Sequence, residues 1–436
     1  MNNTKPEAGL RGAPTQREAF AVWLKIGLLS FGGPAAQIAL MHKYVVEENR
    51  WLSEKQFLSA LSFCMLLPGP EAMQLATYAG WRIHGVAGGL VAGLLFVIPG
   101  ALIVLALGSA YVIFGEFGWF NALFLGIKAA VIIVVVEALL RVSKRALGSV
   151  EHWVIAGLAF CAIFFLNLPF PLIIALAAVF GFFRLREKTE ASHGETTSTH
   201  GLPQQQLYGT LLTVISWLAL WAAPLLLLYL AGLSGFLLDL GVFFSKLAVV
   251  TFGGAYAVLA YLAQDVVSIK GWLSAGEMMD GLGLAETTPG PLILVTEFVG
   301  FLAGFREGGF ALGFLAAVVT LWVTFVPCFL WIFAGAPYIE WIGQQPRLKM
   351  ALSAITAAVV GVILNLSVWF ALHVMFTEVA VTRYGWLTLW WPTLASVDWL
   401  VLGLTLFCAV AVFRWHWNIV KVLIISALLG LIPLSI

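Results

Sequence analysis

The stretch Leu66-Leu67-Pro68-Gly69-Pro70-Glu71-Ala72 places two prolines and a glycine in the middle of an apolar run. Proline removes a backbone donor and fixes φ, and glycine allows conformations that a helix does not use. A second interruption, Gly32-Gly33-Pro34, lies in the preceding apolar run. Both motifs predict helices that break inside an apolar segment rather than at its end.

Both interruptions recur in the second half of the chain at a constant distance. Ser30-Phe31-Gly32-Gly33 returns as Thr251-Phe252-Gly253-Gly254, and Pro68-Gly69-Pro70 returns as Pro289-Gly290-Pro291, each 221 residues later. Without gaps, 15 residues of Lys25–Pro70 are identical in Lys246–Pro291. Self-similarity in a fixed register predicts a duplicated structural unit. We expect the four breaks to lie together near the centre of the bilayer.

The composition predicts a membrane protein. Of the 436 residues, 61% are hydrophobic and only 10% are charged, whereas soluble domains carry about 25% charged residues. Runs of roughly 20 apolar residues cross a hydrocarbon core of about 30 Å as helices, and they lack the alternation of a β-barrel strand. We therefore predict an all-α polytopic membrane protein with about 13 transmembrane segments, two homologous repeats and broken helices.

Several function classes are excluded by what the sequence lacks. The net charge of +1 does not indicate nucleic-acid binding. The four cysteines have no metal-ligand spacing, the seven histidines form no HExxH motif, and no phosphate-binding loop of the Walker type is present. We therefore expect no metal, no cofactor and no ATP-driven step in this chain.

The repeat and one polar stretch predict the domain boundaries. Residues 1–18 form a tail, 19–183 the first repeat, 184–206 a polar linker, 207–231 an extra helix and 232–436 the second repeat. An unmatched helix makes the second repeat enter the membrane from the opposite face. Inverted repeats are typical of secondary transporters, whose site lies at the bilayer midplane between the repeats.

The distribution of lysine and arginine predicts a cytoplasmic N-terminus. With the tail inside, cytoplasmic loops follow at Arg82, at Arg141/Lys144/Arg145 and at Arg184/Arg186/Lys188. The stretch Met41–Gln56 fits less well, because it carries basic residues on the outer side. It is either an outer loop or an interfacial helix.

The breaks also predict an anion site. The N-terminus of a half-helix exposes N–H groups and favours negative charge, and threonine hydroxyls beside it either donate to an oxyanion or bond back to their own helix. The alternative is that these residues are kinks and packing glycines. The candidate substrate-binding residues are Lys25, Ser30, Gly32, Gly33, Gly69, Glu71, Gln74, Lys246, Thr251, Gly253, Gly254, Thr287, Thr288 and Gly290.

Ionisable residues within spans are costly and are functional hypotheses by default. We predict that Lys246 complements the anion, since it lies deeper in its span than Lys25, which could instead snorkel. Glu71 either caps a half-helix or is protonated when the anion is bound. Lys128 and Glu137 are nine residues apart, so we expect no direct ion pair between them. The candidate coupling residues are Glu71, Lys128, Glu137 and Glu286.

At these residues the sequence resembles the chromate ion transporter family in its long, two-domain form. The resemblance rests on Phe31-Gly32-Gly33-Pro34, Trp51-Leu52, Leu67–Ala72 and Gln74–Thr77, and on Thr251–Tyr256 and Glu286–Pro291 in the second half. It implies export of chromate across the bacterial inner membrane, driven by the electrochemical gradient, with sulfate as competitor. The repeats differ at the site, because Leu292 matches Glu71 and Leu67 matches Thr288.

Two other readings of the same residues stay open. One is an importer or exchanger of sulfate or another small anion. The other is a membrane-embedded enzyme acting on lipid or isoprenoid phosphate, which would need a convergent nucleophile, metal or acid–base set. The expected partners are chromate and the lipid bilayer, with no nucleic acid, and a homodimer is left open.

Overall fold

The computed structural model describes residues 14–184, 204–232, 235–252, 255–339, 342 and 345–432. Most of the predicted tail and linker lie outside these ranges. The elements of the first repeat are α1 (Gln16–Leu29), α2 (Gly33–His42), the π-helical turn η1 (Lys43–Glu48), α3 (Glu54–Cys64), α4 (Glu71–Phe114), α5 (Gly118–Ala146), α6 (Val150–Phe164) and α7 (Phe170–Arg184). The stretch Met41–Gln56 therefore holds the end of α2, a π-helical turn and the start of α3.

The rest of the chain begins with α8 (Gln204–Leu230), which covers most of the predicted extra helix. The second repeat follows with α9 (Phe236–Val250), α10 (Ala255–Ala263), η3 (Gln264–Ile269), α11 (Ala275–Thr287), η4 (Leu292–Leu294), α12 (Val295–Gly335), η5 (Ala336–Tyr338), α14 (Pro346–Met375), η6 (Leu394–Ser396), α15 (Trp399–Phe413) and α16 (Ile419–Gly430). Strands β1 (Val379–Tyr384) and β2 (Leu387–Pro392) form an antiparallel hairpin between α14 and η6, which the apolar pattern did not predict.

Among the described residues, the predicted Pro-Gly-Pro break is present in both repeats and the Gly-Gly break is present in the first. Gly32 and Gly33 have φ values of +83° and +76° between α1 and α2. Gly69 has φ +118° between α3 and α4, and Gly290 has φ +95° between α11 and η4. Left-handed backbone is readily available only to glycine, which explains why the breaks fall at these residues. The spans expected to begin near Ala19 and Phe57 are each built from half-length helices.

The helices α4 and α12 each fold back on themselves. Non-helical backbone at His84 and Gly85 divides α4 into arms 71–83 and 86–114, and Gly308 and Gly309 divide α12 in the same way. The arms of α4 touch through glycine: a Cβ added to Gly80 would lie 2.3 Å from the Gly88 carbonyl oxygen. Small residues allow such close packing of helices in membranes.

The two repeats exchange their last helices. In the first repeat α6 and α7 pack against α14 of the second, and in the second repeat α15 and α16 pack against α5 of the first. A Cβ on Gly361 would lie 2.0 Å from the Ala156 carbonyl oxygen, and a Cβ on Gly126 equally close to that of Ser426. Ser426 Oγ also donates to the Gly126 carbonyl oxygen at 2.7 Å. Each repeat therefore depends on helices of the other repeat to bury part of its apolar surface.

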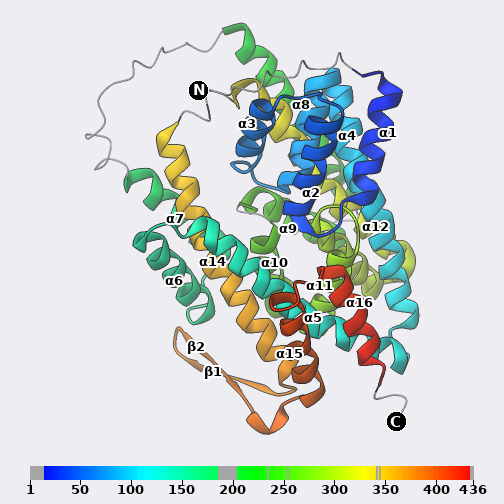
Figure 1. Ribbon diagram of the computed structural model, residues 1–436, viewed down its shortest axis with the longest axis vertical. Coiled ribbons are helices and arrows are strands. Elements are labelled where there is room, and N and C mark those ends of the chain that lie inside the picture. The colour runs from blue at the N-terminus through cyan, green and yellow to red at the C-terminus, as the bar shows by residue number, and fades with distance from the viewer. Residues whose placement is uncertain are drawn as a thin grey trace, which may run out of the picture.

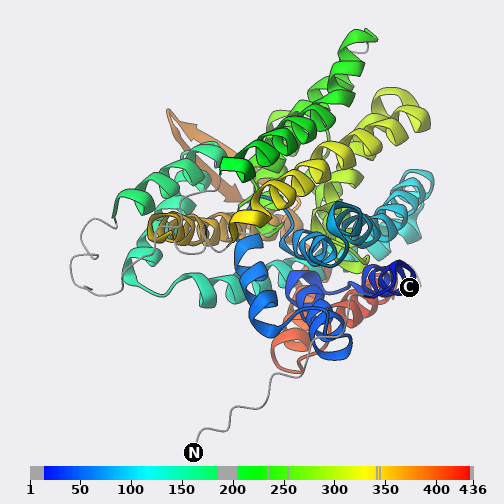
Figure 2. The same ribbon diagram turned by 90° about the horizontal axis from the view of Figure 1, so that it is seen from above.

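Figure 1 shows how these parts are distributed along the molecule. Helices α1, α2 and α3 lie in its upper part, and α11, α15, α16 and the β-hairpin lie in its lower part. Seen from above, α8 runs beside α12 at the edge of the molecule (Figure 2). Trp221 Nε1 fixes α8 there by donating to the Val323 carbonyl oxygen at 2.9 Å.

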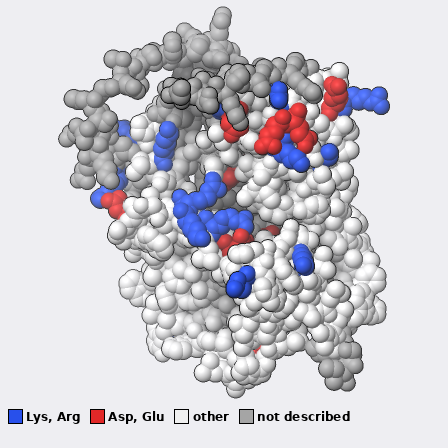
Figure 3. Space-filling view, viewed as in Figure 1, with Lys and Arg blue, Asp and Glu red and all other residues white. Residues whose placement is uncertain are grey.

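Among the described residues, five helices are long and apolar enough to cross a membrane: those of residues 71–114, 118–146, 208–230, 292–338 and 346–375. Shorter apolar helices (α6, α7, α15 and α16) accompany them. Because α4 and α12 each contain two arms and several expected spans are split, the 13 expected segments do not correspond one to one with these helices. On the face seen in Figure 3, charged residues gather along the upper part and around a hollow at mid-height.

Candidate functional site

The breaks of the two repeats are hydrogen-bonded to each other. The Gly69 N–H donates to the Thr251 carbonyl oxygen at 2.9 Å, and the Gly290 N–H donates to the Ser30 carbonyl oxygen at 2.9 Å. Gly69 matches Gly290 and Ser30 matches Thr251 at the 221-residue offset, so the two bonds are equivalent. The Pro-Gly-Pro break of each repeat is thus bonded to the residue that ends the helix before the Gly-Gly motif of the other repeat.

Two glutamines satisfy carbonyl groups that the breaks leave without helical partners. Gln37 Nε2 donates to the carbonyl oxygens of Ser30 and Gly290, at 3.2 and 2.6 Å. Gln74 Nε2 donates to that of Pro68 at 2.7 Å. Buried carbonyl groups need such partners. The side-chain amide of Gln74 therefore stabilises the backbone of the Pro-Gly-Pro break in the first repeat.

A cavity of about 280 Å³ opens beside the breaks of the first repeat. The hollow in Figure 3 carries basic and acidic atoms together at mid-height. Three half-helices, α2, α4 and α10, begin at the cavity wall, each contributing a residue from its first turn. The cavity is lined by Pro34, Ala35, Met65, Glu71, Ala138, Arg141, Val142, Arg145, Tyr256 and Thr356.

Two of the three charged residues in the cavity wall are basic. Arg141 and Arg145 lie four residues apart on α5, so their side chains share one face of that helix. Arg141 forms an ion pair with Glu137, and no ion pair of Arg145 is found among the described residues. Glu71 is the acidic residue of the wall. The arrangement offers two guanidinium groups and three helix N-termini to an anion.

Behind the wall lies a buried acid. Tyr256 donates its hydroxyl to Glu286 Oε1 at 2.8 Å, and Glu286 is only 3% exposed. The hydroxyl of Tyr256 belongs to the second repeat, while Glu71 and the two arginines belong to the first. The site is therefore shared between the repeats, and each repeat alone would lack part of it.

Comparison with known proteins identifies the family. A family model described as chromate transporter matches residues 17–182 and again residues 238–431. This chain belongs to the chromate transporter family. The two matches cover both repeats and most of the chain, in agreement with its long form.

The transporter is similar to several known proteins. It is 33% identical over 427 residues to the chromate transport protein of Pseudomonas aeruginosa, covering 95% of this chain and 91% of that one. It is 31% identical over 345 residues to a probable chromate transport protein of Synechococcus elongatus, covering 78% and 81%. An uncharacterized transporter of Methanocaldococcus jannaschii is 27% identical, covering 85% and 88%. No solved structure matches.

In the transporter, the predicted serine and threonine hydroxyls bond back to their own helices. Ser30 Oγ donates to the Ile26 carbonyl oxygen at 2.6 Å, and Thr251 Oγ1 donates to that of Leu247. Thr287 and Thr288 donate to carbonyl groups of α11. In the structure these hydroxyls therefore donate to carbonyl groups about one turn away in their own helix, which is the alternative to donation to an oxyanion. Gly253 and Gly254 lie outside the described residues.

The structure brings neither candidate lysine to the cavity. Lys25 and Lys246 are exposed and occupy matching positions on α1 and α9. The ammonium of Lys25 lies 4.6 Å from the centre of the Tyr44 ring. Each helix buries its other face, with Trp23 and Ile26 in α1 and Phe244 and Leu247 in α9. The helical period therefore directs both lysines outward.

The coupling candidates do not lie together. Glu71 lines the cavity. Lys128 Nζ lies 3.2 Å from Asp280 Oδ2, and Glu137 pairs with Arg141 one turn along α5. As expected from their spacing, Lys128 and Glu137 do not pair with each other. Glu286 is enclosed behind Tyr256.

The two arginines of the cavity are the residues that sequence reasoning missed. Arg141 and Arg145 were assigned to a cytoplasmic loop, but α5 continues to Ala146 and carries both. A signal was present, because Glu137, Arg141 and Arg145 follow each other at helical spacing directly after an apolar run. The number of positive charges near a helix end indicates topology but not which helix face the charges share.

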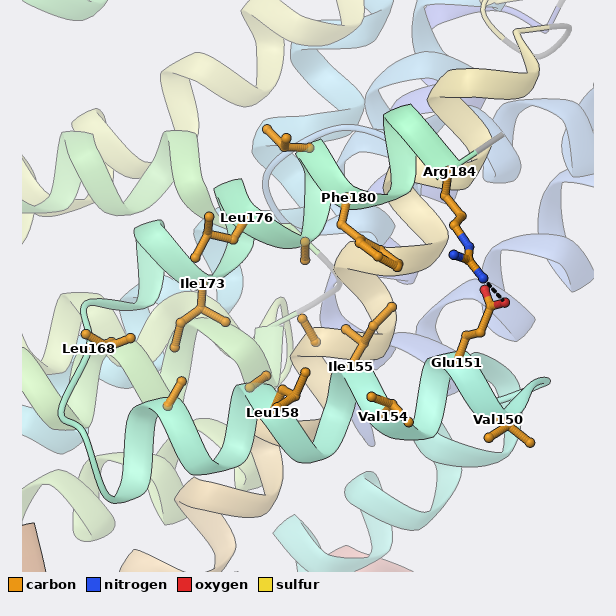
Figure 4. Close-up of a pocket in the computed structure, with 15 residues that line it drawn as sticks. Val150, Glu151, Val154, Ile155, Leu158, Leu168, Ile173, Leu176, Phe180 and Arg184 are labelled. Carbon is orange, nitrogen blue, oxygen red and sulfur yellow. Dashed lines mark hydrogen bonds and ion pairs between the residues drawn. The ribbon is translucent and has the colours of Figure 1, made fainter. Parts of the chain in front are cut away.

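A second, larger hollow does not suit an anion. The groove between α6 and α7 has a volume of about 670 Å³ (Figure 4). Most of the residues that line it are apolar, among them Leu158, Ile173 and Phe180. Glu151 and Arg184 lie at one end, paired at 2.8 Å. The groove thus offers no row of donors to a dianion.

Proposed function

We propose that this protein is a secondary transporter that exports chromate from the bacterial cytoplasm across the inner membrane. The observation that carries the proposal is the basic cavity at the point where the broken helices of both repeats meet. Family membership favours transport over the lipid-phosphate enzyme. The relatives from Pseudomonas aeruginosa and Synechococcus elongatus carry chromate transport in their names.

The charge of the cavity suits a tetrahedral dianion. An isolated ion in a medium of low dielectric constant costs tens of kcal/mol, so its water must be replaced by donors and opposite charge. Guanidinium groups bind oxyanions with two parallel hydrogen bonds. Arg141 and Arg145 supply that pattern, and helix N-termini add partial positive charge of about +0.5 each. In this proposal the arginines take the part that the sequence assigned to Lys246.

We propose that the two repeats cross the membrane in opposite orientations, with the N-terminus in the cytoplasm. Support comes from the constant 221-residue offset, from the unmatched helix α8 between the repeats, and from the two equivalent hydrogen bonds at the breaks. Alternating access then moves one repeat against the other around a site between them.

Glu71 is the coupling candidate that shares the cavity with the substrate. An ionised Glu71 would repel a dianion beside Arg145, so we propose that it is protonated while chromate is bound. Glutamine in its place would bind the anion without a proton. Lys128, Glu137 and Glu286 are engaged with other side chains and stay secondary candidates.

Sulfate has the same shape and charge and is the alternative substrate. The test is uptake of radiolabelled chromate into inverted membrane vesicles, with sulfate as competitor and an uncoupler as control. We expect uptake in the wild type that the uncoupler abolishes, and loss of uptake in Arg145→Gln. Lys144→Gln is the matched control, because Lys144 is exposed and adjacent but does not line the cavity. Equal uptake in Arg145→Gln and wild type would remove the basic cavity from the mechanism.

A further inference from the structure

An enclosed carboxyl group lies in the second repeat, away from the cavity. Glu297 is 1% exposed, and neither of its carboxyl oxygens has a hydrogen-bond partner among the described residues. It lies in the first turn of α12, directly after the Pro-Gly-Pro break and η4. At the 221-residue offset its counterpart is Ala76, so the first repeat has no such group.

Two further unpartnered groups lie on the other arm of α12, which packs against the arm that carries Glu297. Thr320 and Thr324 are 0% and 1% exposed, and their hydroxyl oxygens have no partner among the residues described. Thr320 Oγ1 would lie 2.3 Å from a Cβ added to Gly300, which is three residues from Glu297 on the same helix face. Because the arms run antiparallel, Thr324 lies one turn closer to the level of Glu297.

The row of polar groups continues to the break of the first repeat. Cys328, one turn beyond Thr324, donates its Sγ–H to the Thr324 carbonyl oxygen at 3.5 Å. Its Sγ would lie 2.9 Å from a Cβ on Gly69. The neighbouring Gln74 Oε1 is buried and without a partner among the described residues, and Gln74 is one turn from Glu71. The row thus runs from the cavity wall to Glu297.

The charged groups of the surrounding elements are engaged elsewhere. Lys246 of α9 is exposed and Glu71 of α4 lines the cavity. Other ionisable groups of the neighbouring elements form their own contacts: Asp280 with Lys128 and Tyr111, Glu286 with Tyr256, and Glu277 with Arg306. In the described part of the chain no basic group pairs with a carboxylate at Glu297, and burial of an uncompensated charge strongly favours the neutral form.

We propose that Glu297 is a proton-binding site of the transporter, filled in this conformation and emptied when the α12 hairpin opens. The first turn of a helix partly stabilises a carboxylate, which lets the group release its proton once water reaches it. Glu71 shares the cavity with the substrate, whereas Glu297 does not, so its proton stays bound while the anion binds or leaves. The inference rests on the proposed function, for which it names the coupled ion.

Dicyclohexylcarbodiimide tests the site without measuring transport, because it reacts with protonated carboxyl groups in apolar surroundings. The full-length protein in liposomes is treated at several pH values, and the modified peptides are identified by mass spectrometry. We expect modification at Glu297 that declines as the pH rises, and none at position 297 in Glu297→Gln. Glu307→Gln is the matched control, since Glu307 is exposed on the same helix. No modification of Glu297 at any pH, or protection by sodium ions alone, overturns the proposal.

A second measurement separates this site from the chromate proposal. Liposomes with a trapped pH indicator report proton movement during chromate transport. We expect Glu297→Gln to exchange chromate within about threefold of the wild type, while proton movement per chromate falls to the part that Glu71 carries. Unchanged proton movement in Glu297→Gln overturns the proton site. If the wild type moves no chromate but Glu297 is modified, the chromate proposal fails and the proton site stands.

Discussion

Replacement of Gly69 by alanine tests whether the reciprocal contact between the breaks holds the structure together. Gly69 has φ +118°, and an added Cβ would lie 2.8 Å from Gln74 Nε2 and 2.9 Å from Cys328 Sγ. Left-handed backbone costs an L-residue about 1–2 kcal/mol. Overpacking a well-filled interior costs about 1–3 kcal/mol more. We therefore expect Gly69→Ala to lower the free energy of unfolding by about 2–5 kcal/mol.

Gly85→Ala separates the two contributions. Gly85 has φ +64°, but nothing lies within 4 Å of its added Cβ, so only the backbone cost of about 1–2 kcal/mol applies. The assay is denaturant unfolding in mixed micelles, with both variants compared to wild type. The double variant Gly69→Ala/Cys328→Ala should recover part of the loss, because it removes one of the two clashing atoms. Equal stability of Gly69→Ala and Gly85→Ala would refute the packing argument.

Three further predictions concern transport. Arg145→Gln should lower chromate affinity about ten- to a hundredfold, since a hydrogen bond to a charged group contributes about 1.5–3 kcal/mol. Binding of radiolabelled chromate measures the affinity, and an unchanged value would contradict a chromate site at Arg145. Lys246→Gln should leave uptake within about twofold of wild type, because the side chain does not line the cavity. Complete loss of uptake would restore the lysine to the mechanism. Glu71→Gln should flatten the pH dependence of chromate uptake, as glutamine does not titrate. A profile parallel to that of the wild type would exclude Glu71.

Much of the local structure followed from the sequence. The helix breaks could be placed because the backbone chemistry of glycine and proline acts at the residue itself. The duplication was visible because matched residues keep a constant spacing, whatever the fold. The membrane class followed from composition, since a chain with so few charged residues cannot cover a surface in water.

Only the tertiary structure decided which surroundings each charged side chain has. Lys246 and Arg145 are both exposed and both follow apolar runs, but the face of α5 that carries Arg145 borders the cavity and the face of α9 that carries Lys246 does not. Those faces depend on the partner helices, and here α5 is packed against α15 and α16 from the other repeat. Such long-range packing leaves no local signature. The sequence therefore determined where the helices break, and the packing of one repeat against the other decided which charges meet there.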